Sequence, residues 1–117
     1  MNKRELGSKY ELRAAEFLKQ NGYSILEKNY RCRFGEIDLI GRSEGYLCFI
    51  EVKYRSDSGY GFPSEAVDSR KIRRICRTAL SYISFKKLPA DTACRFDIVV
   101  ILDKKFTLIK NAFEGIY

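Results

Sequence analysis

Charged residues interrupt two short apolar segments of the chain, residues 35–40 and 49–53. Side chains two residues apart point to the same face of a β-strand, so Glu51 and Lys53 of the second segment share one face. Carboxylates and a lysine are the groups that position a metal ion and a water molecule in metal-dependent hydrolysis. The second segment therefore contains residue types suited to part of an oxygen-ligand metal site.

The sequence between the two segments predicts how their acidic residues meet. Glu44 and Gly45 suit a two-residue hairpin turn, and the register that follows sets Asp38 opposite Glu51. Side chains paired in this way have Cβ atoms about 5 Å apart, where two carboxylates repel by roughly 3 kcal/mol at an effective dielectric of about 20. A divalent cation would remove this repulsion, so we expect Mg²⁺ or Mn²⁺ between Asp38 and Glu51.

Phosphodiester hydrolysis is a reaction that this set of residues suits. A metal ion held by Asp38 and Glu51 can activate water and stabilise the oxyanion, while Lys53 orients the water or stabilises charge in the transition state. Further candidate metal ligands are the carbonyl of Val52 and the carboxylate of Glu11, which borders the apolar face of the first predicted helix. The alternative for the strand residues is a structural ion network, and the alternative for Glu11 is an exposed surface position.

Glu36 is the remaining acidic residue of the first segment. It has the same parity as Asp38, so the two side chains are expected on one face. The projected hairpin sets Glu36 opposite Lys53. It is therefore either another metal ligand or the partner of a structural ion pair.

The composition restricts the classes of function. The 117 residues include 22 Lys and Arg against 15 Asp and Glu, and the net charge of +7 favours a polyanionic partner such as nucleic acid. The absence of histidine excludes Ser-His-Asp and Cys-His hydrolases and histidine-ligated zinc enzymes. The four cysteines form no C-x-x-C pair and are expected to be small buried or half-buried thiols. No apolar run could span a bilayer and no signal-peptide pattern is present, so we expect a cytoplasmic protein without membrane contact.

Apolar periodicity and turn signals predict a single domain over residues 1–117 with the element order α-β-β-β-α-β-β. Helices are expected at residues 3–20 and 64–85, the second with Ser64 as its N-cap. Strands are expected at residues 23–30, 35–40, 49–53, 95–102 and 106–110. Because the second helix would cross over the sheet, the strands before and after it should be parallel. The predicted fold class is α/β, a single mixed β-sheet flanked by helices.

Basic residues gather on the second predicted helix and at a predicted bend over residues 31–33. No glutamate lies four residues from any arginine between Arg70 and Arg77, so these arginines form a stripe that is not neutralised along the helix. We expect phosphate contacts from the following residues: Arg31, Arg33, Arg55, Arg70, Lys71, Arg73, Arg74 and Arg77. The alternative is an ordinary solvated surface.

Three motifs, taken together, resemble those of the YraN-like uncharacterised family of bacteria. They are Gly-Glu-Ile-Asp-Leu-Ile at 35–40, Phe-Ile-Glu-Val-Lys-Tyr-Arg at 49–55, and Pro-Ser-Glu-Ala-Val at 63–67 with Lys71. The resemblance extends from residue 7 to residue 97. That family in turn looks like a member of the PD-(D/E)xK nuclease superfamily, with a restriction-endonuclease-like core, and its order of motifs is similar to that of archaeal Holliday-junction resolvases.

The resemblance implies a role for each acidic residue. Glu11 matches the helix glutamate of that family, Asp38 the metal-binding aspartate, and Glu51 with Lys53 the E-x-K pair. Tyr10 is a departure, because the family usually has glycine before the helix glutamate.

The implied function is a Mg²⁺-dependent endonuclease that hydrolyses DNA phosphodiester bonds, with structured or branched DNA among its substrates. A non-catalytic nucleic-acid-binding module that retains the nuclease fold is the first alternative, and a structural or partner-binding domain is the second. One copy of the site cuts one strand, so symmetric cutting of a duplex or junction would require a homodimer.

Overall fold

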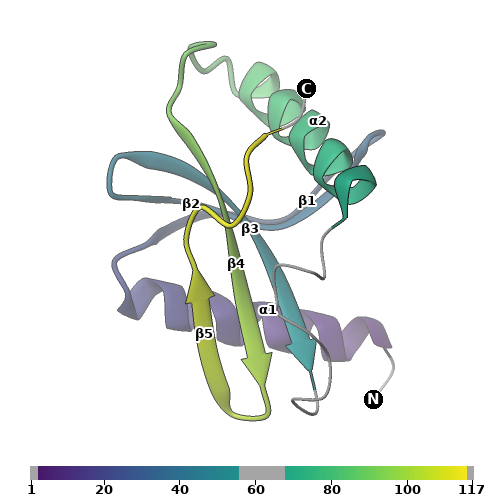
Figure 1. Cartoon of the computed structure of the whole chain (residues 1–117), viewed down its shortest axis with the longest axis vertical. Helices are drawn as coiled ribbons and strands as arrows, with labels where there is room; N and C mark the ends of the chain where they lie inside the picture. The colour runs from purple at the N-terminus through teal and green to yellow at the C-terminus, as the bar shows by residue number, and fades with distance from the viewer. Residues whose placement is uncertain (1–2, 56–67, 116–117) are drawn as a thin grey trace.

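Five strands form one mixed β-sheet with a helix on each face (Figure 1). The computed structural model describes residues 3–55 and 68–115. The strands lie in the order β1 (Ser24–Cys32), β2 (Gly35–Ser43), β3 (Tyr46–Arg55), β4 (Cys94–Leu102) and β5 (Lys105–Ile109), and the helices are α1 (Lys3–Gln20) and α2 (Ser69–Phe85). Only the β3–β4 pair is parallel within this described sheet. The predicted element order, single mixed sheet and parallel pair are therefore confirmed.

Helix α1 begins and ends at the predicted residues, and its last turn shows why it ends there. Gly22 has a φ of +88°, a left-handed conformation that glycine adopts without steric cost. The N–H groups of Gly22 and Tyr23 donate to the carbonyls of Lys19 and Leu18, at 3.3 and 3.0 Å. These two hydrogen bonds satisfy carbonyls of the last helical turn, and the chain then continues into β1.

The hairpin between β2 and β3 has the predicted turn and register. Glu44 and Gly45 have φ values of +56° and +83°, as a two-residue turn between twisted strands requires. The backbone pairs run from Ser43 with Tyr46 to Leu39 with Ile50. The paired region of these two strands thus ends one residue before Asp38.

Several predicted boundaries were wrong. Strands β2 and β3 are longer than the predicted residues 35–40 and 49–53, since they end at Ser43 and span Tyr46–Arg55. Arg31 and Cys32 belong to β1, and the turn before β2 consists of residues 33–34. Helix α2 begins at Ser69, because the extended backbone of Asp68 makes this residue the N-cap, and the Asp68 carboxylate accepts the N–H of Lys71 at 2.8 Å. The predicted N-cap, Ser64, lies outside the described residues.

The sheet separates two apolar cores. Helix α2 covers one face, where Ile75, Ala79 and Tyr82 pack with strand residues such as Phe49 and Ile98. Helix α1 covers the other face through a second cluster, built from Ala14, Ala15, Leu18, Tyr23, Leu39, Cys48, Ile50, Val99 and Ile101. Because each helix is fixed to its own face, charged residues at the ends of β2 and β3 can be reached from both sides of the sheet.

Neither of the two described helices has the length and apolarity needed to cross a bilayer. Cys48 and Cys76 are buried and Cys32 and Cys94 are half-buried, as the sequence predicted.

Candidate active site

Asp38 lies at an irregularity between β1 and β2. The backbone pairing of these strands omits Asn29 with Asp38, although the pairs on either side are formed. Asn29 has a φ of +54°, a left-handed conformation that asparagine tolerates better than most residues. The side chains flanking Asp38 pack on opposite faces of the sheet, Ile37 against the α2 core and Leu39 against the α1 core. Asp38 therefore lies where β2 changes face, between the two helices.

The surroundings of Asp38 are unfavourable for its charged form. Its Oδ2 accepts the backbone N–H of Val52 at 2.8 Å. Burial, followed by the nearby charge of Glu51 and a smaller effect of Glu11, raises the pKa of Asp38 to about 8, even though the Val52 bond opposes this shift. The structure thus brings together the three acidic residues that the sequence singled out.

Two lysines lie on the Glu51 carboxylate. Its Oε1 is 3.2 Å from Nζ of Lys53 and 2.8 Å from Nζ of Lys71. Burial lowers the pKa of Lys53, and the adjacent Lys71 lowers it further. The pKa of Lys71 is raised, because its bonds to Glu51 and Lys53 outweigh the effect of burial. The sequence assigned Lys71 to substrate phosphate and gave no signal of this contact with Glu51, which depends on how α2 packs.

Glu11 reaches the site from α1, and two tyrosines connect that helix to β3. The Tyr10 and Tyr54 rings stack with centroids 4.1 Å apart and planes inclined by 19°. Tyr10 directly precedes Glu11, and Tyr54 directly follows Lys53. The residue that departs from the family pattern therefore packs α1 against the strand that bears the E-x-K pair.

Glu36 is not a member of the site but the partner of an ion pair, which was one of its two predicted roles, although its partner is Arg31 and not Lys53. Its side chain is 53% exposed and pairs with Nε of Arg31 at 2.9 Å. The predicted pairing of Glu36 with Lys53 does not form, because the alternation of side chains between the two faces of the sheet is interrupted at Asp38. Arg31, one of the predicted phosphate-binding residues, is engaged by this surface ion pair.

The remaining basic residues form a surface beside the acidic site. Arg70, Arg73, Arg74 and Arg77 are exposed on α2, a helix that contains no acidic residue. The turn between β1 and β2 lies directly against this helix, since a Cβ on Gly35 would be 3.3 Å from Oγ1 of Thr78 and 3.9 Å from Cβ of Arg74. The exposed Arg33 of that turn is therefore close to the arginines of α2.

Arg55 lies half-buried at the end of β3, where its Nη1 donates to the carbonyl of Tyr54 at 3.3 Å. It is separated by one residue from Lys53 along the strand. The positively charged Arg55 thus lies two residues after the lysine of the E-x-K pair.

The site offers two carboxylates, Asp38 and Glu51, for the predicted divalent cation. Within residues 3–55 and 68–115, no three acidic or sulfur-bearing side chains converge closely enough to hold a metal ion by themselves. Mg²⁺ commonly uses only one or two carboxylates and completes its shell with water. Asp38 and Glu51 supply those two carboxylates, and the pKa of Asp38 is raised first by burial and then by the negative charge of Glu51, which a cation would neutralise. The ligand roles predicted for Glu11 and the Val52 carbonyl stay predictions.

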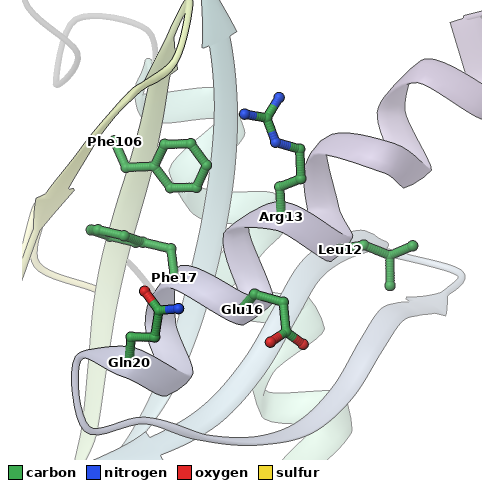
Figure 2. Close-up of a pocket in the computed structure, with 6 residues that line it drawn as sticks. All are labelled: Leu12, Arg13, Glu16, Phe17, Gln20 and Phe106. Atoms are coloured by element: carbon green, nitrogen blue, oxygen red, sulfur yellow. The ribbon is translucent and has the colours of Figure 1, made fainter.

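A separate hollow of about 440 Å³ lies between α1 and β5 (Figure 2). The Phe17 and Phe106 rings meet edge to face at 5.0 Å between centroids, and the guanidinium of Arg13 lies 5.5 Å from the Phe106 ring centre. Its lining consists of Leu12, Arg13, Glu16, Phe17, Gln20 and Phe106. None of the predicted site residues lines this hollow.

Comparison of the sequence with known proteins finds matches from one family. The sequence profile described as "Uncharacterised protein family UPF0102" matches residues 10–101. Proteins named UPF0102 protein are similar to the chain over almost their whole length. One from Lachnoclostridium phytofermentans is 52% identical, covering 98% of this chain and 98% of its own. Another from Acetivibrio thermocellus is 48% identical, covering 96% and 93%, and one from Persephonella marina is 41% identical, covering 92% of each.

Proposed function

This chain belongs to the uncharacterised protein family UPF0102, and from the geometry of its site we propose that it is a divalent-metal-dependent endonuclease acting on DNA. The observation that carries the proposal is the carboxylate pair. Asp38 is half-buried with a raised pKa beside Glu51, and two ionised carboxylates in this arrangement are unfavourable unless a cation joins them. Perturbed carboxylates of this kind concentrate at functional sites.

The residues around the pair supply the other requirements of phosphodiester hydrolysis. A bound Mg²⁺ or Mn²⁺ would polarise a phosphate oxygen and lower the pKa of a water molecule. Lys53 lies 3.2 Å from Glu51, so its Nζ is suited to orient that water or to stabilise negative charge in the transition state. Asp38 and Glu51 hold the metal in this proposal, and Glu11 approaches from α1.

The neighbouring basic surface supports nucleic acid as the substrate. Four exposed arginines and no acidic residue lie on α2, whose first turn places Lys71 at the site. Arginines arranged along a helix suit repeated contacts with phosphates. The restriction-endonuclease-like identity of the core is part of this proposal, supported by the parallel β3–β4 pair and by carboxylates on β2 and β3.

Cleavage assays with matched substitutions test the proposal. Supercoiled plasmid, single strands and a four-way junction would each be incubated with Mg²⁺ or Mn²⁺ and with wild type, Asp38→Asn or Lys53→Met. Asp91→Asn is the control, since Asp91 is an exposed loop residue on which the proposed chemistry does not depend. We expect cleavage by wild type and the control, and a loss of at least about 100-fold in the two site variants.

Cleavage that Asp38→Asn and Lys53→Met retain would contradict the proposal. Salt-sensitive DNA binding by all four proteins, without cleavage or metal binding, would instead favour the non-catalytic binding module. The ion pairs of Glu51 with two lysines are the specific observation on the side of that alternative, because they show that cations of the protein itself can neutralise this carboxylate.

A further inference from the structure

The side chain of Lys71 lies between two parts of the molecule, the acidic site and the arginine surface of α2. In the structure its Nζ lies 2.8 Å from Glu51, so it acts as a counter-ion of the acidic site. The same residue belongs to α2, where the adjacent Arg70 and the next-turn Arg74 are exposed. Its N–H is fixed by the N-cap Asp68, but its side chain has four rotatable carbons and a compact charge that suits single phosphate contacts. The backbone of Lys71 is thus held while its ammonium group can move.

Two lysines already neutralise Glu51, so a bound metal ion would add more positive charge than this carboxylate can balance. Lys53 and Lys71 both contact the same oxygen, Oε1. A divalent cation bound by Asp38 and Glu51 would neutralise the carboxylate that attracts the lysines and would repel both ammonium groups. At least one lysine should therefore leave Glu51 when the metal binds.

Lys71 is the lysine that can leave at lower cost. Its side chain is 31% exposed, against 18% for Lys53, so a smaller change in solvation accompanies its movement. It also enters from α2 rather than from β3, and the arginine surface beside it is where a DNA backbone would lie. Lys53 is fixed on the same strand as Glu51, two residues away.

We propose that Lys71 is a positioning residue that neutralises Glu51 in the absence of metal and transfers to a DNA phosphate when the metal binds. Metal occupancy would thereby add one phosphate contact and couple cation binding to DNA binding. This inference rests on the proposed function, because it requires a metal between Asp38 and Glu51.

Calorimetric titration with Ca²⁺, which takes the same oxygen ligands as Mg²⁺, tests the first half without DNA. Lys71→Met and Lys71→Gln remove the competing charge, so both should bind Ca²⁺ roughly fivefold more tightly than wild type. Lys86→Met removes the same charge from the C-cap of α2, about 22 Å along the helix axis from Lys71, and its affinity should equal that of wild type. Asp38→Asn should not bind, and thermal unfolding of each variant confirms that it is folded.

The salt dependence of DNA binding tests the second half. The slope of log K against log salt changes by about 0.9 for each phosphate contact. With Ca²⁺ present, wild type should have a slope steeper than that of Lys71→Met by about 0.9. With chelator instead of Ca²⁺ the two slopes should agree, because Lys71 then contacts Glu51 in wild type.

The outcomes separate this inference from the function on which it rests. If wild type binds Ca²⁺ and Asp38→Asn does not, but both Lys71 variants bind as weakly as wild type, the metal site stands and the transfer of Lys71 is wrong. A slope difference that is the same with and without Ca²⁺ overturns the transfer as well. If no protein in the set binds Ca²⁺, the metal site and the inference both fail.

Discussion

Two aspartates of the same sheet, Asp97 fully buried and Asp38 half-buried, have opposite surroundings. Asp97 on β4 is fully buried and accepts bonds from a guanidinium, a phenol and a backbone amide. Asp38 on β2 accepts one backbone amide and lies close to the carboxylates of Glu51 and Glu11 and to the ammonium group of Lys71. The first charge is neutralised by direct bonds from the protein, whereas the second is balanced only in part by Lys71, and its pKa stays raised. This difference distinguishes a structural carboxylate from one that is available for chemistry.

The surroundings of Asp97 form a closed network. Arg95 donates from Nε to Asp97 Oδ1 at 3.0 Å, the Tyr23 hydroxyl donates to Oδ2 at 2.6 Å, and the Asn111 N–H donates to Oδ1 at 2.9 Å. Burial raises the pKa of Tyr23 and its bond to Asp97 raises it further, so the phenol stays a neutral donor. Although burial opposes it, Asp97 raises the pKa of Arg95. The network connects β4 to the start of β1 and to the chain after β5.

Breaking this network should give the largest effect. Asp97→Asn leaves the Arg95 guanidinium, 7% exposed, without its main counter-charge. We expect the free energy of unfolding to fall by about 4 kcal/mol, since removing one partner of a buried ion pair is strongly destabilising. Urea unfolding measures this change, and a loss below about 1 kcal/mol would show that the network is weaker than its geometry indicates.

The equivalent substitution at the other aspartate should have the opposite sign. The pKa of Asp38 is raised from 3.8 to about 8, so the folded protein retains a proton that the unfolded chain releases between these values. The unfolding free energy of wild type therefore falls as the pH rises through this window. Asparagine cannot ionise and its carbonyl can still accept the Val52 N–H, so without metal Asp38→Asn should be more stable than wild type by about 3 kcal/mol at pH 8.

This gain should shrink as the pH falls toward about 4, where Asp38 is protonated in both the folded and the unfolded protein. Urea unfolding at pH 4, 6 and 8 with chelator present measures it. An equal stability difference at every pH would mean that Asp38 has an ordinary pKa, and the contrast with Asp97 would then be lost.

A divalent cation should make the Asp38 region resemble the Asp97 region. Ligand binding to the folded state alone adds about 1.4 kcal/mol to the unfolding free energy at ten times the dissociation constant. We expect Ca²⁺ to stabilise wild type by this amount, with no effect on Asp38→Asn, while Asp97→Asn should gain as much as wild type despite its lower starting stability. Thermal or urea unfolding over a Ca²⁺ series measures the effect, and stabilisation of all three proteins would indicate binding elsewhere.

The sequence predicted the elements whose signals are local. Gly22 after an apolar stripe fixed the end of α1, and Glu44 with Gly45 fixed the hairpin and its register as far as Leu39. The crossover helix implied the parallel β3–β4 pair. Each of these depends on a few neighbouring residues or on a general rule of topology, so a single sequence was sufficient.

The sequence could not predict features that depend on distant contacts. Glu36 was placed on the wrong face, because nothing local indicates that Asn29 adopts a left-handed conformation opposite Asp38. The bond between Tyr23 and Asp97 joins residues 74 positions apart, and the Lys71–Glu51 pair depends on the packing of α2. The acidic residues of the site were found from their types and their family resemblance, but their charge balance required the fold.

The smallest effect should come from the exposed rim of the Asp97 network. Glu44 is 55% exposed and its Oε1 accepts from Lys110 at 2.7 Å and from Arg95 at 3.1 Å. These bonds, that from Lys110 first, lower the pKa of Glu44. The contribution of Glu44 to the free energy of unfolding is therefore present above its ordinary pKa of 4.5 and is lost as the pH falls below it, which is opposite to the pH dependence that Asp38 gives.

Glu44→Gln keeps the turn but removes the charge, and we expect a slight loss of stability at pH 7 that disappears in about 1 M NaCl, where the screening length is about 3 Å. Thermal unfolding at low and high salt measures it, with Asp91→Asn as an exposed control. A loss as large as that of Asp97→Asn and insensitive to salt would mean that the network extends to the surface, and burial would then not be what separates its strong bonds from its weak ones.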